Sequence, residues 1–112
     1  MAEKEFMEKV YQALETAKAS GKIKKGINEV TKVIEKGDAK LVAYASDVNP
    51  AEIVMHLPLL CKEKGIPCAK VGTREELGAV SGLTVPTVAV AIVKEGDAKN
   101  LIKQIADEAA GQ

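Results

Sequence analysis

The sequence predicts a single α/β domain, a three-layer α/β/α sandwich around a mixed sheet of about four strands. Segments with helical spacing of apolar residues alternate along the chain with short apolar runs. Two of these runs, residues 41–45 and 85–93, lack polar alternation, as expected of strands that helices cover on both faces. The 112 residues are 46% hydrophobic, enough for one core, and no linker or internal repeat divides them. We therefore expect one domain over residues 1–112.

The first element is a helix over residues 3–19, which Gly21 ends. A basic stretch, residues 22–25, leads to a short second helix that Asn28 should cap and Gly37 should end. The inward-facing residues of these two helices are expected to be Phe6, Val10, Ala13, Leu14, Ala17, Val30, Val33 and Ile34.

A third helix follows the strand at residues 41–45. Asn49 is its expected cap, Pro50 takes the first helical position, and Glu52 lies three residues after the cap. Pro58 should kink this helix by removing a hydrogen bond. The buried face is expected to consist of Ile53, Val54, Leu57, Leu60 and Cys61.

Two strands and two helices make up the rest of the chain. We expect strands over residues 66–71 and 85–93. Between them, Thr73 and Glu76 form a capping-box pattern, which starts a helix that ends near residues 78–82. The inward residues of a last helix, residues 97–110, are expected to be Leu101, Ile102, Ile105 and Ala109.

Compartment signals favour a soluble, cytoplasmic protein. No apolar run approaches the roughly 20 residues of a membrane span. The first five residues are acidic and polar, whereas a secretory signal is basic and then apolar. Cys61 and Cys68 indicate free thiols in a reducing compartment, because a chain of this length folds without disulfides.

Motifs for catalysis, metals and cofactors are weak, and we expect no enzyme. Residues 21–26 have the glycine spacing of a phosphate loop, but residues 27–28 replace the required Lys-Ser/Thr pair. The histidine and the two cysteines match no zinc spacing. Asp47 follows an apolar strand, where a catalytic carboxylate could lie, although a turn-forming aspartate is commoner there. An enzyme that depends on Cys61 or Asp47 stays open as an alternative.

Charge is unevenly distributed along this neutral chain, which has 16 basic and 16 acidic residues. Residues 18–40 hold 7 basic and 3 acidic groups. A local basic patch suits a small, specific anionic target better than indiscriminate coating of DNA. A solvated lysine-rich segment is the alternative explanation.

Residues 24–32 combine lysines with an amide and a carboxylate at the start of a predicted helix. As local structure, Asn28 caps the helix and Glu29 complements its dipole. As a binding site, the helix N-terminus and the lysines suit phosphate, Lys32 could donate to guanine O6 and N7, and Glu29 could accept from guanine N1 and N2 hydrogens. A carboxylate would weaken phosphate binding, so its presence favours base reading. These residues alone leave both explanations open.

Residues 26–32 resemble the G-x-N-E-x-T-K signature of the kink-turn-binding ribosomal protein family, the archaeal large-subunit L7Ae type. Two further blocks agree: residues 49–61, with an H-L-P-L-L-C core, and residues 77–78 followed by 82–86. The resemblance covers nearly the whole chain in the same order and implies the same α/β/α sandwich. Three positions depart from the family pattern: Ala79 and Thr84 stand where archaeal relatives commonly have a basic and an acidic residue, and Cys68 stands where an aromatic residue is frequent. The family is also usually more basic than this chain.

The resemblance implies RNA binding without catalysis. Family members bind kink-turns, which are internal loops of RNA bent around tandem sheared G·A pairs, in ribosomal RNA, box C/D and box H/ACA guide RNAs and ribonuclease P RNA. We expect this chain to stabilise that bend and nucleate ribonucleoprotein assembly with core proteins, as a free monomer without cofactor or membrane. A metabolite- or protein-binding α/β module, with an incidental basic patch, is the alternative.

The family motif also assigns roles to individual residues. By position, Gly26, Asn28, Glu29 and Lys32 would contact the G·A guanines, Lys25 and Lys36 would lie beside phosphates, and Leu83, Thr84 and Val85 would cover flipped-out bases, with Ile53 packing beneath them. Outside the motif, Arg74 could supply a compensating phosphate contact, and an exposed arginine beside a helix cap is the equal alternative.

Overall fold

The computed structural model describes the backbone of residues 3–48 and 52–110 and the side chains of residues 5–48 and 55–107. In chain order the elements are α1 (Glu3–Ser20), β1 (Lys22–Lys25), α2 (Ile27–Glu35), β2 (Leu41–Ala45), α3 (Glu52–Lys64), β3 (Cys68–Val71), α4 (Arg74–Val80), β4 (Ala89–Lys94), a 3₁₀ turn η1 (Gly96–Ala98) and α5 (Lys99–Ala110).

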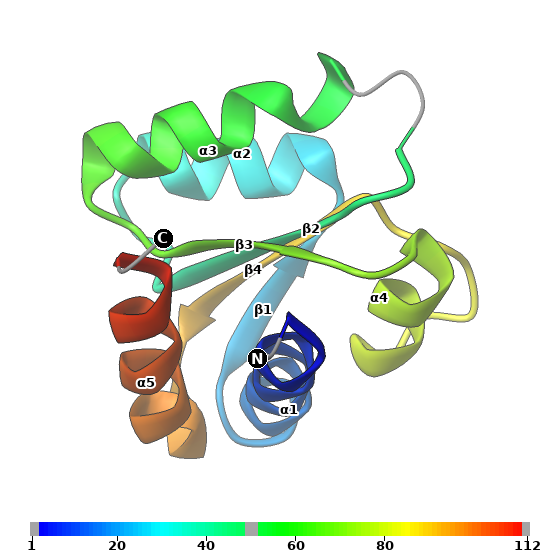
Figure 1. Cartoon of the computed structure of the whole chain (residues 1–112), viewed down its shortest axis with the longest axis vertical. Coiled ribbons are helices and arrows are strands. Elements are labelled where there is room, and N and C mark those ends of the chain that lie inside the picture. The colour runs from blue at the N-terminus through cyan, green and yellow to red at the C-terminus, as the bar shows by residue number, and fades with distance from the viewer. Residues whose placement is uncertain (1–2, 49–51, 111–112) are drawn as a thin grey trace.

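The four strands form one mixed sheet in the order β1-β4-β2-β3. Strand β4 is antiparallel to both of its neighbours, and β2 is parallel to β3. Helices α2 and α3 cover one face of the sheet, and α1, α4 and α5 cover the other (Figure 1). The predicted three-layer α/β/α sandwich with a mixed sheet is confirmed.

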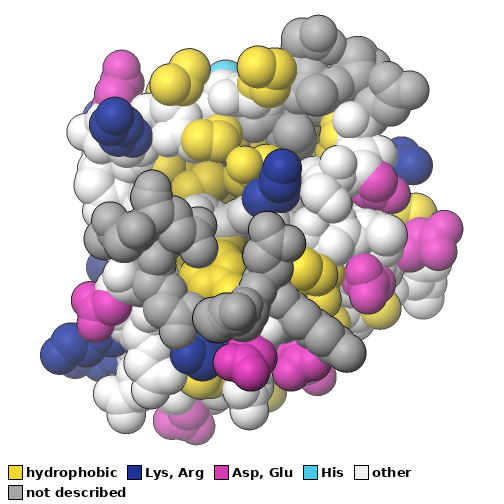
Figure 2. All heavy atoms as spheres, viewed as in Figure 1, with side chains coloured by type: hydrophobic (Ala, Val, Ile, Leu, Met, Phe, Trp, Pro, Cys, Tyr) yellow, Lys and Arg dark blue, Asp and Glu magenta, His cyan; other side chains and the backbone are white. Residues whose placement is uncertain are grey.

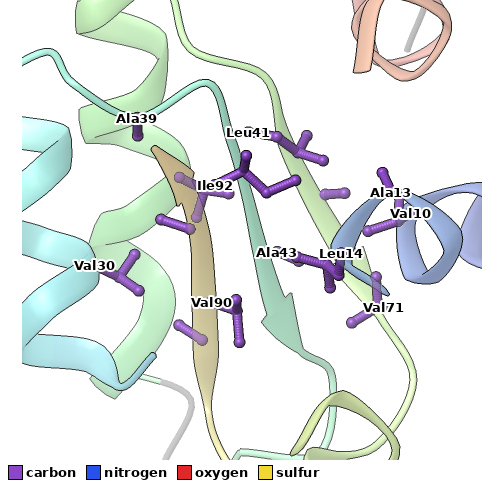
Figure 3. Close-up of a cluster of buried hydrophobic side chains, with 14 of the residues drawn as sticks. Val10, Ala13, Leu14, Val30, Ala39, Leu41, Ala43, Val71, Val90 and Ile92 are labelled. Carbon is purple, nitrogen blue, oxygen red and sulfur yellow. The ribbon is translucent and has the colours of Figure 1, made fainter. Parts of the chain in front are cut away.

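The core lies on both faces of the two central strands, β2 and β4. Leu41, Val42, Ala43, Val90 and Ile92 are fully buried, and Figure 3 shows side chains of α1 and α2 meeting such residues from opposite sides. This burial explains why both strands lack polar alternation. The inward residues predicted for the first two helices are all buried: Phe6, Val10, Ala13, Leu14, Ala17, Val30, Val33 and Ile34.

The later helices follow the same rule. Leu57, Cys61, Ile102 and Ile105 are buried as predicted, whereas Leu60 and Leu101 are only half-buried. The side chains of Ile53, Val54 and Ala109 and the cap at residues 49–50 lie outside the described residues. Helix α3 runs without interruption through Pro58, and the kink expected there stays a prediction.

Several elements differ from those predicted, and the strands differ in three places. The basic stretch, which was not assigned as a strand, is β1; it lies at the sheet edge, where lysines are tolerated because they face water and discourage pairing with another chain. The strand predicted over residues 85–93 begins only at Ala89, because Pro86 has no N–H and the Thr87 N–H bonds the Arg74 carbonyl. The strand predicted over residues 66–71 begins at Cys68.

The start of α4 is capped as the sequence predicts. Thr73 Oγ1 accepts from the Glu76 N–H at 3.1 Å, and Glu76 Oε1 accepts from the Thr73 N–H at 3.1 Å. The last helix, by contrast, is preceded by the 3₁₀ turn η1 rather than starting directly at residue 97. In the described part of the chain, no helix combines the length and the apolar character needed to cross a membrane.

Alkaline pH should destabilise the fold through two tyrosines. Burial raises the pKa of Tyr44, and burial also raises the pKa of Tyr11 against the opposing effect of the Gly72 N–H, which donates to its phenol oxygen at 3.0 Å. A group whose pKa is higher in the folded state contributes stability below its unfolded pKa and loses that contribution as pH rises through its folded pKa.

We therefore expect the urea midpoint of unfolding to fall as pH rises from about 8 to about 11. Lysine deprotonation adds its own trend over this range, so the comparison with Tyr44→Phe isolates the tyrosine. The fall should be shallower in that variant. Parallel curves for the two proteins would contradict a contribution from Tyr44.

Candidate functional site

The start of α2, which belongs to the predicted site, meets the end of β2 and the segment leading into β4 at one end of the sheet. The Gly26 N–H, just before α2, donates to the Ala89 carbonyl at 2.9 Å, and the Ala45 N–H at the end of β2 donates to the Val88 carbonyl at 2.9 Å. These bonds join the start of α2 and the end of β2 to the segment that connects α4 to β4. Figure 1 shows the start of α2 and this connection on the same side of the molecule.

Gly26 is the N-cap of α2, at φ 96° and ψ 149°. This backbone region is open only to glycine without strain, and here it turns the chain from an edge strand into a helix. The prediction that Asn28 caps the helix is wrong, because the turn occurs two residues earlier and places Asn28 inside the first helical turn. No side chain makes a cap hydrogen bond at this helix start.

The first turn of α2 is open to a ligand. The Val30 N–H bonds the Gly26 carbonyl, so the preceding N–H groups of the helix, at residues 27–29, have no intrahelical acceptor. A Cβ placed on Gly26 would meet nothing within 4 Å, so the space in front of that residue is clear. Uncapped amides at the positive end of a helix dipole suit an anion or a base carbonyl.

The polar residues predicted on α2 face solvent. Asn28, Glu29 and Lys32 are exposed, as is Lys25 at the end of β1, whereas Gly26 is half-buried. Glu29 and Lys32 are three residues apart, so their side chains share one helix face. The structure thus groups a carboxylate, an amide and two ammonium groups around the helix start.

Lys36 lies elsewhere. It is the C-cap residue of α2, and the nine-residue helix places it about 13 Å along the axis from the helix start. Its side chain is exposed. A ligand that contacts both Gly26 and Lys36 must therefore extend along the whole of α2.

The predicted apolar loop, residues 83–85, is held against α4. The Leu83 N–H donates to the Gly78 carbonyl at 2.9 Å, and a Cβ on Gly78 would collide with the Val85 carbonyl oxygen. Leu83 is half-buried, Thr84 is exposed, and the Val85 side chain is 60% exposed although it is apolar. The loop therefore presents an aliphatic surface to solvent.

A shallow hollow of about 390 Å³ lies between this loop and the outer side of α4. The sequence did not single out two of its residues, Glu75 and Pro86. Pro86 belongs to a block that resembles the family, but no sequence pattern connected Glu75 to this part of the surface. The hollow is lined by Glu75, Ala79, Leu83, Thr84, Val85 and Pro86.

Arg74, predicted beside a phosphate, is engaged within the protein. Its Nε lies 3.5 Å from Asp47 Oδ1, and the same carboxylate oxygen accepts from the Arg74 N–H at 2.9 Å. Asp47 therefore holds the start of α4, which is a structural role of the turn-forming kind. The Arg74 side chain is 48% exposed, and the ion pair uses one of its five guanidinium donors.

The thiols lie near the end of α3 and at the start of β3, away from the start of α2 (Figure 1). Cys61 is buried and Cys68 half-buried, and both are free. A hydrogen bond between the two thiols raises the pKa of Cys68, which keeps that thiol protonated, and lowers the pKa of Cys61. Among the described residues, no three His, Cys, Asp or Glu side chains gather where they could hold a metal ion.

Comparison with known proteins identifies a family, and solved structures are similar to this chain. The model of the ribosomal protein L7Ae/L30e/S12e/Gadd45 family matches residues 8–102. The structure of the Giardia lamblia 15.5kD RNA binding protein is similar to this chain with a TM-score of 0.89 and 33% sequence identity, over 96% of this chain and 89% of that one. The family match includes all of α2 and the loop at residues 83–85.

Proposed function

The chain belongs to the ribosomal protein L7Ae/L30e/S12e/Gadd45 family, and from this premise we propose that it is an RNA-binding protein that recognises kink-turns. The observation that carries the proposal is the exposed, uncapped start of α2, where Glu29 lies among lysines. The similarity to an RNA-binding protein supports the same class of ligand.

The geometry of α2 fits a base-reading role. Ordinary A-form RNA hides its base edges in a deep, narrow major groove, but a bent loop with sheared G·A pairs opens them. The start of α2 enters that opening, with the backbone of Gly26 close to the RNA. Glu29 accepts from guanine N1 and N2 hydrogens, Lys32 donates to O6 and N7, and Lys25 lies beside a phosphate.

The loop at residues 83–85 supplies apolar cover for bases that the kink splays out. Aromatic residues make up only 3% of the chain, so the contact is aliphatic rather than ring stacking. Val85 is the main contributor, because its side chain is the exposed apolar group there. Arg74 reaches a phosphate with the guanidinium donors that Asp47 leaves free.

By this proposal the protein binds rather than catalyses. Its targets are kink-turns in ribosomal RNA, box C/D and box H/ACA guide RNAs and ribonuclease P RNA, and it acts as a cytoplasmic, initially monomeric scaffold. Because the protein binds the bent form of the RNA more tightly, binding shifts the RNA towards that form. Core proteins of the ribonucleoprotein then bind to the bent RNA.

A mobility-shift comparison tests the proposal. We expect the protein to bind a kink-turn RNA at least about a hundredfold more tightly than the same RNA with its sheared pairs replaced by Watson–Crick pairs, a difference of about 2.7 kcal/mol. Equal affinity for the two RNAs would contradict kink-turn recognition. Stabilisation by a small anion together with indifference to RNA would instead favour a metabolite-binding module.

Lys36→Ala should separate phosphate contact from base reading. Because Lys36 lies at the far end of α2, we expect its loss to lower the slope of log affinity against log salt by about 1, with little change in the preference for the kink-turn. Titrations at several salt concentrations measure the slope. A variant that loses the preference for the kink-turn would place Lys36 among the base-reading residues instead.

A further inference from the structure

A hydrogen bond joins two segments that resemble family blocks, and the proposed function gives this bond no role. Thr31 of α2 and His56 of α3 lie with Oγ1 and Nε2 3.0 Å apart. Both residues are half-buried, and 25 positions separate them in the sequence. The bond therefore links the helix that carries Glu29 and Lys32 to its neighbour in the same layer.

The place of Thr31 on α2 is informative. At about 100° per residue, Asn28, Lys32 and Glu29 follow Thr31 around the helix in one direction. The residues that follow Thr31 in the other direction are buried and pack on the sheet: Ile34, Val30 and Val33. Thr31 thus lies on the boundary between the ligand-facing arc and the core-facing arc.

Apolar packing alone sets the rotation of such a short helix loosely. Contact between aliphatic surfaces is non-directional, so a small rotation of α2 exchanges one set of van der Waals contacts for another at modest cost. A hydrogen bond weakens steeply when its distance or angle changes. The bond between Thr31 and His56 is therefore suited to select one rotation of α2.

We propose that Thr31 and His56 are a positioning pair, which fixes the rotation of α2 and so the direction in which Glu29 and Lys32 project towards RNA. The inference rests on the proposed function. Neither residue contacts the ligand; both act through the helix. Hydrogen bonds to a base edge require side chains that are positioned with a precision of a fraction of an ångström, and this precision depends on such support.

Two substitutions test the pair. Thr31→Val keeps the shape and the β-branching of the side chain but removes the hydroxyl, and His56→Phe keeps a ring but removes the nitrogens. We expect each to weaken kink-turn binding by about three- to tenfold. Since both remove the same bond, the double variant should lose no more than the weaker-binding single variant, as a double-mutant cycle would measure.

Two conservative variants should restore binding. Thr31→Ser keeps a hydroxyl, and His56→Gln places an amide group near the position of Nε2. Both should bind within about twofold of the wild type, because either can reform the bond. Affinities are measured where urea unfolding shows every variant to be fully folded, so that a loss of stability alone does not reduce them.

Ser20→Ala is the matched control. Ser20 Oγ accepts from the Asp97 N–H at 2.8 Å and donates to the Thr16 carbonyl at 2.8 Å, between α1 and η1 and away from the start of α2. Its loss should lower the urea midpoint and leave the affinity for the kink-turn unchanged.

The outcomes are distinguishable. A wild-type protein that prefers the kink-turn, with Thr31→Val and His56→Phe binding as tightly as it does, would overturn the positioning pair alone. Losses that multiply in the double variant would also overturn it, because they show that the residues act independently. A wild-type protein with no preference for the kink-turn would overturn the proposed function and this inference with it.

Discussion

Glu29→Ala is expected to weaken binding to kink-turn RNA by about 1–3 kcal/mol while leaving affinity for duplex RNA unchanged or slightly higher. The two affinities are expected to respond differently because of the charge of the site. Glu29 is exposed among lysines, so as a phosphate neighbour it repels RNA and as a base reader it accepts from guanine. Its removal should therefore help every contact with the backbone and harm only the contact with the base. Titration of both RNAs at one salt concentration measures the two effects together.

Glu35→Ala is the matched control for this result. It removes the same charge from the same helix, at an exposed position in the last turn of α2. It should change both affinities in the same direction and by little. If Glu29→Ala behaved like Glu35→Ala, Glu29 would act only through its charge, and the start of α2 would not read bases.

The core was predictable because binary patterning alone determines it. Val10, Leu14 and Ala17 recur at helical spacing, and a helix of that pattern can bury only one face. The strand at Lys22–Lys25 gave no such signal, because an edge strand of lysines has neither alternation nor an apolar run. Its identity depends on pairing with β4, a contact between residues some 70 positions apart that no local pattern reports.

The site was predictable in its residue types but not in its geometry. The family signature located Glu29 and Lys32, and the structure places both on an open helix face. The cap was misassigned, because asparagine is the commoner cap residue and the sequence does not reveal that the turn needs the backbone angles of Gly26. The partnership of Arg74 with Asp47, 27 positions away, follows from the parallel pairing of β2 and β3, which brings the ends of both strands to one edge.

Gly78→Ala is the second change expected to have a large effect. Alanine is favoured over glycine in a helix by about 1 kcal/mol, so propensity alone predicts stabilisation. Gly78 lies within α4 but faces the loop at residues 83–85, where a Cβ would collide with the Val85 carbonyl oxygen. Backbone atoms cannot rotate aside as a side chain does, so either α4 or the loop must move. We expect a net loss of about 1–3 kcal/mol in the free energy of unfolding, measured by urea denaturation.

The same displacement should reduce RNA affinity. The Leu83 N–H bonds the Gly78 carbonyl, so a shift at residue 78 moves the loop and turns the exposed Val85 side chain away from a splayed-out base. Loss of that cover should weaken kink-turn binding by up to about 1.5 kcal/mol, because the base buries the Val85 side chain only in part. Ile105→Val is the control, because it removes a buried methylene from α5, costing about 0.5–1.5 kcal/mol of stability, and should leave affinity unchanged. If Gly78→Ala bound the kink-turn as tightly as Ile105→Val does, the loop could be displaced without consequence, and apolar cover of the bases would have to come from another part of the surface.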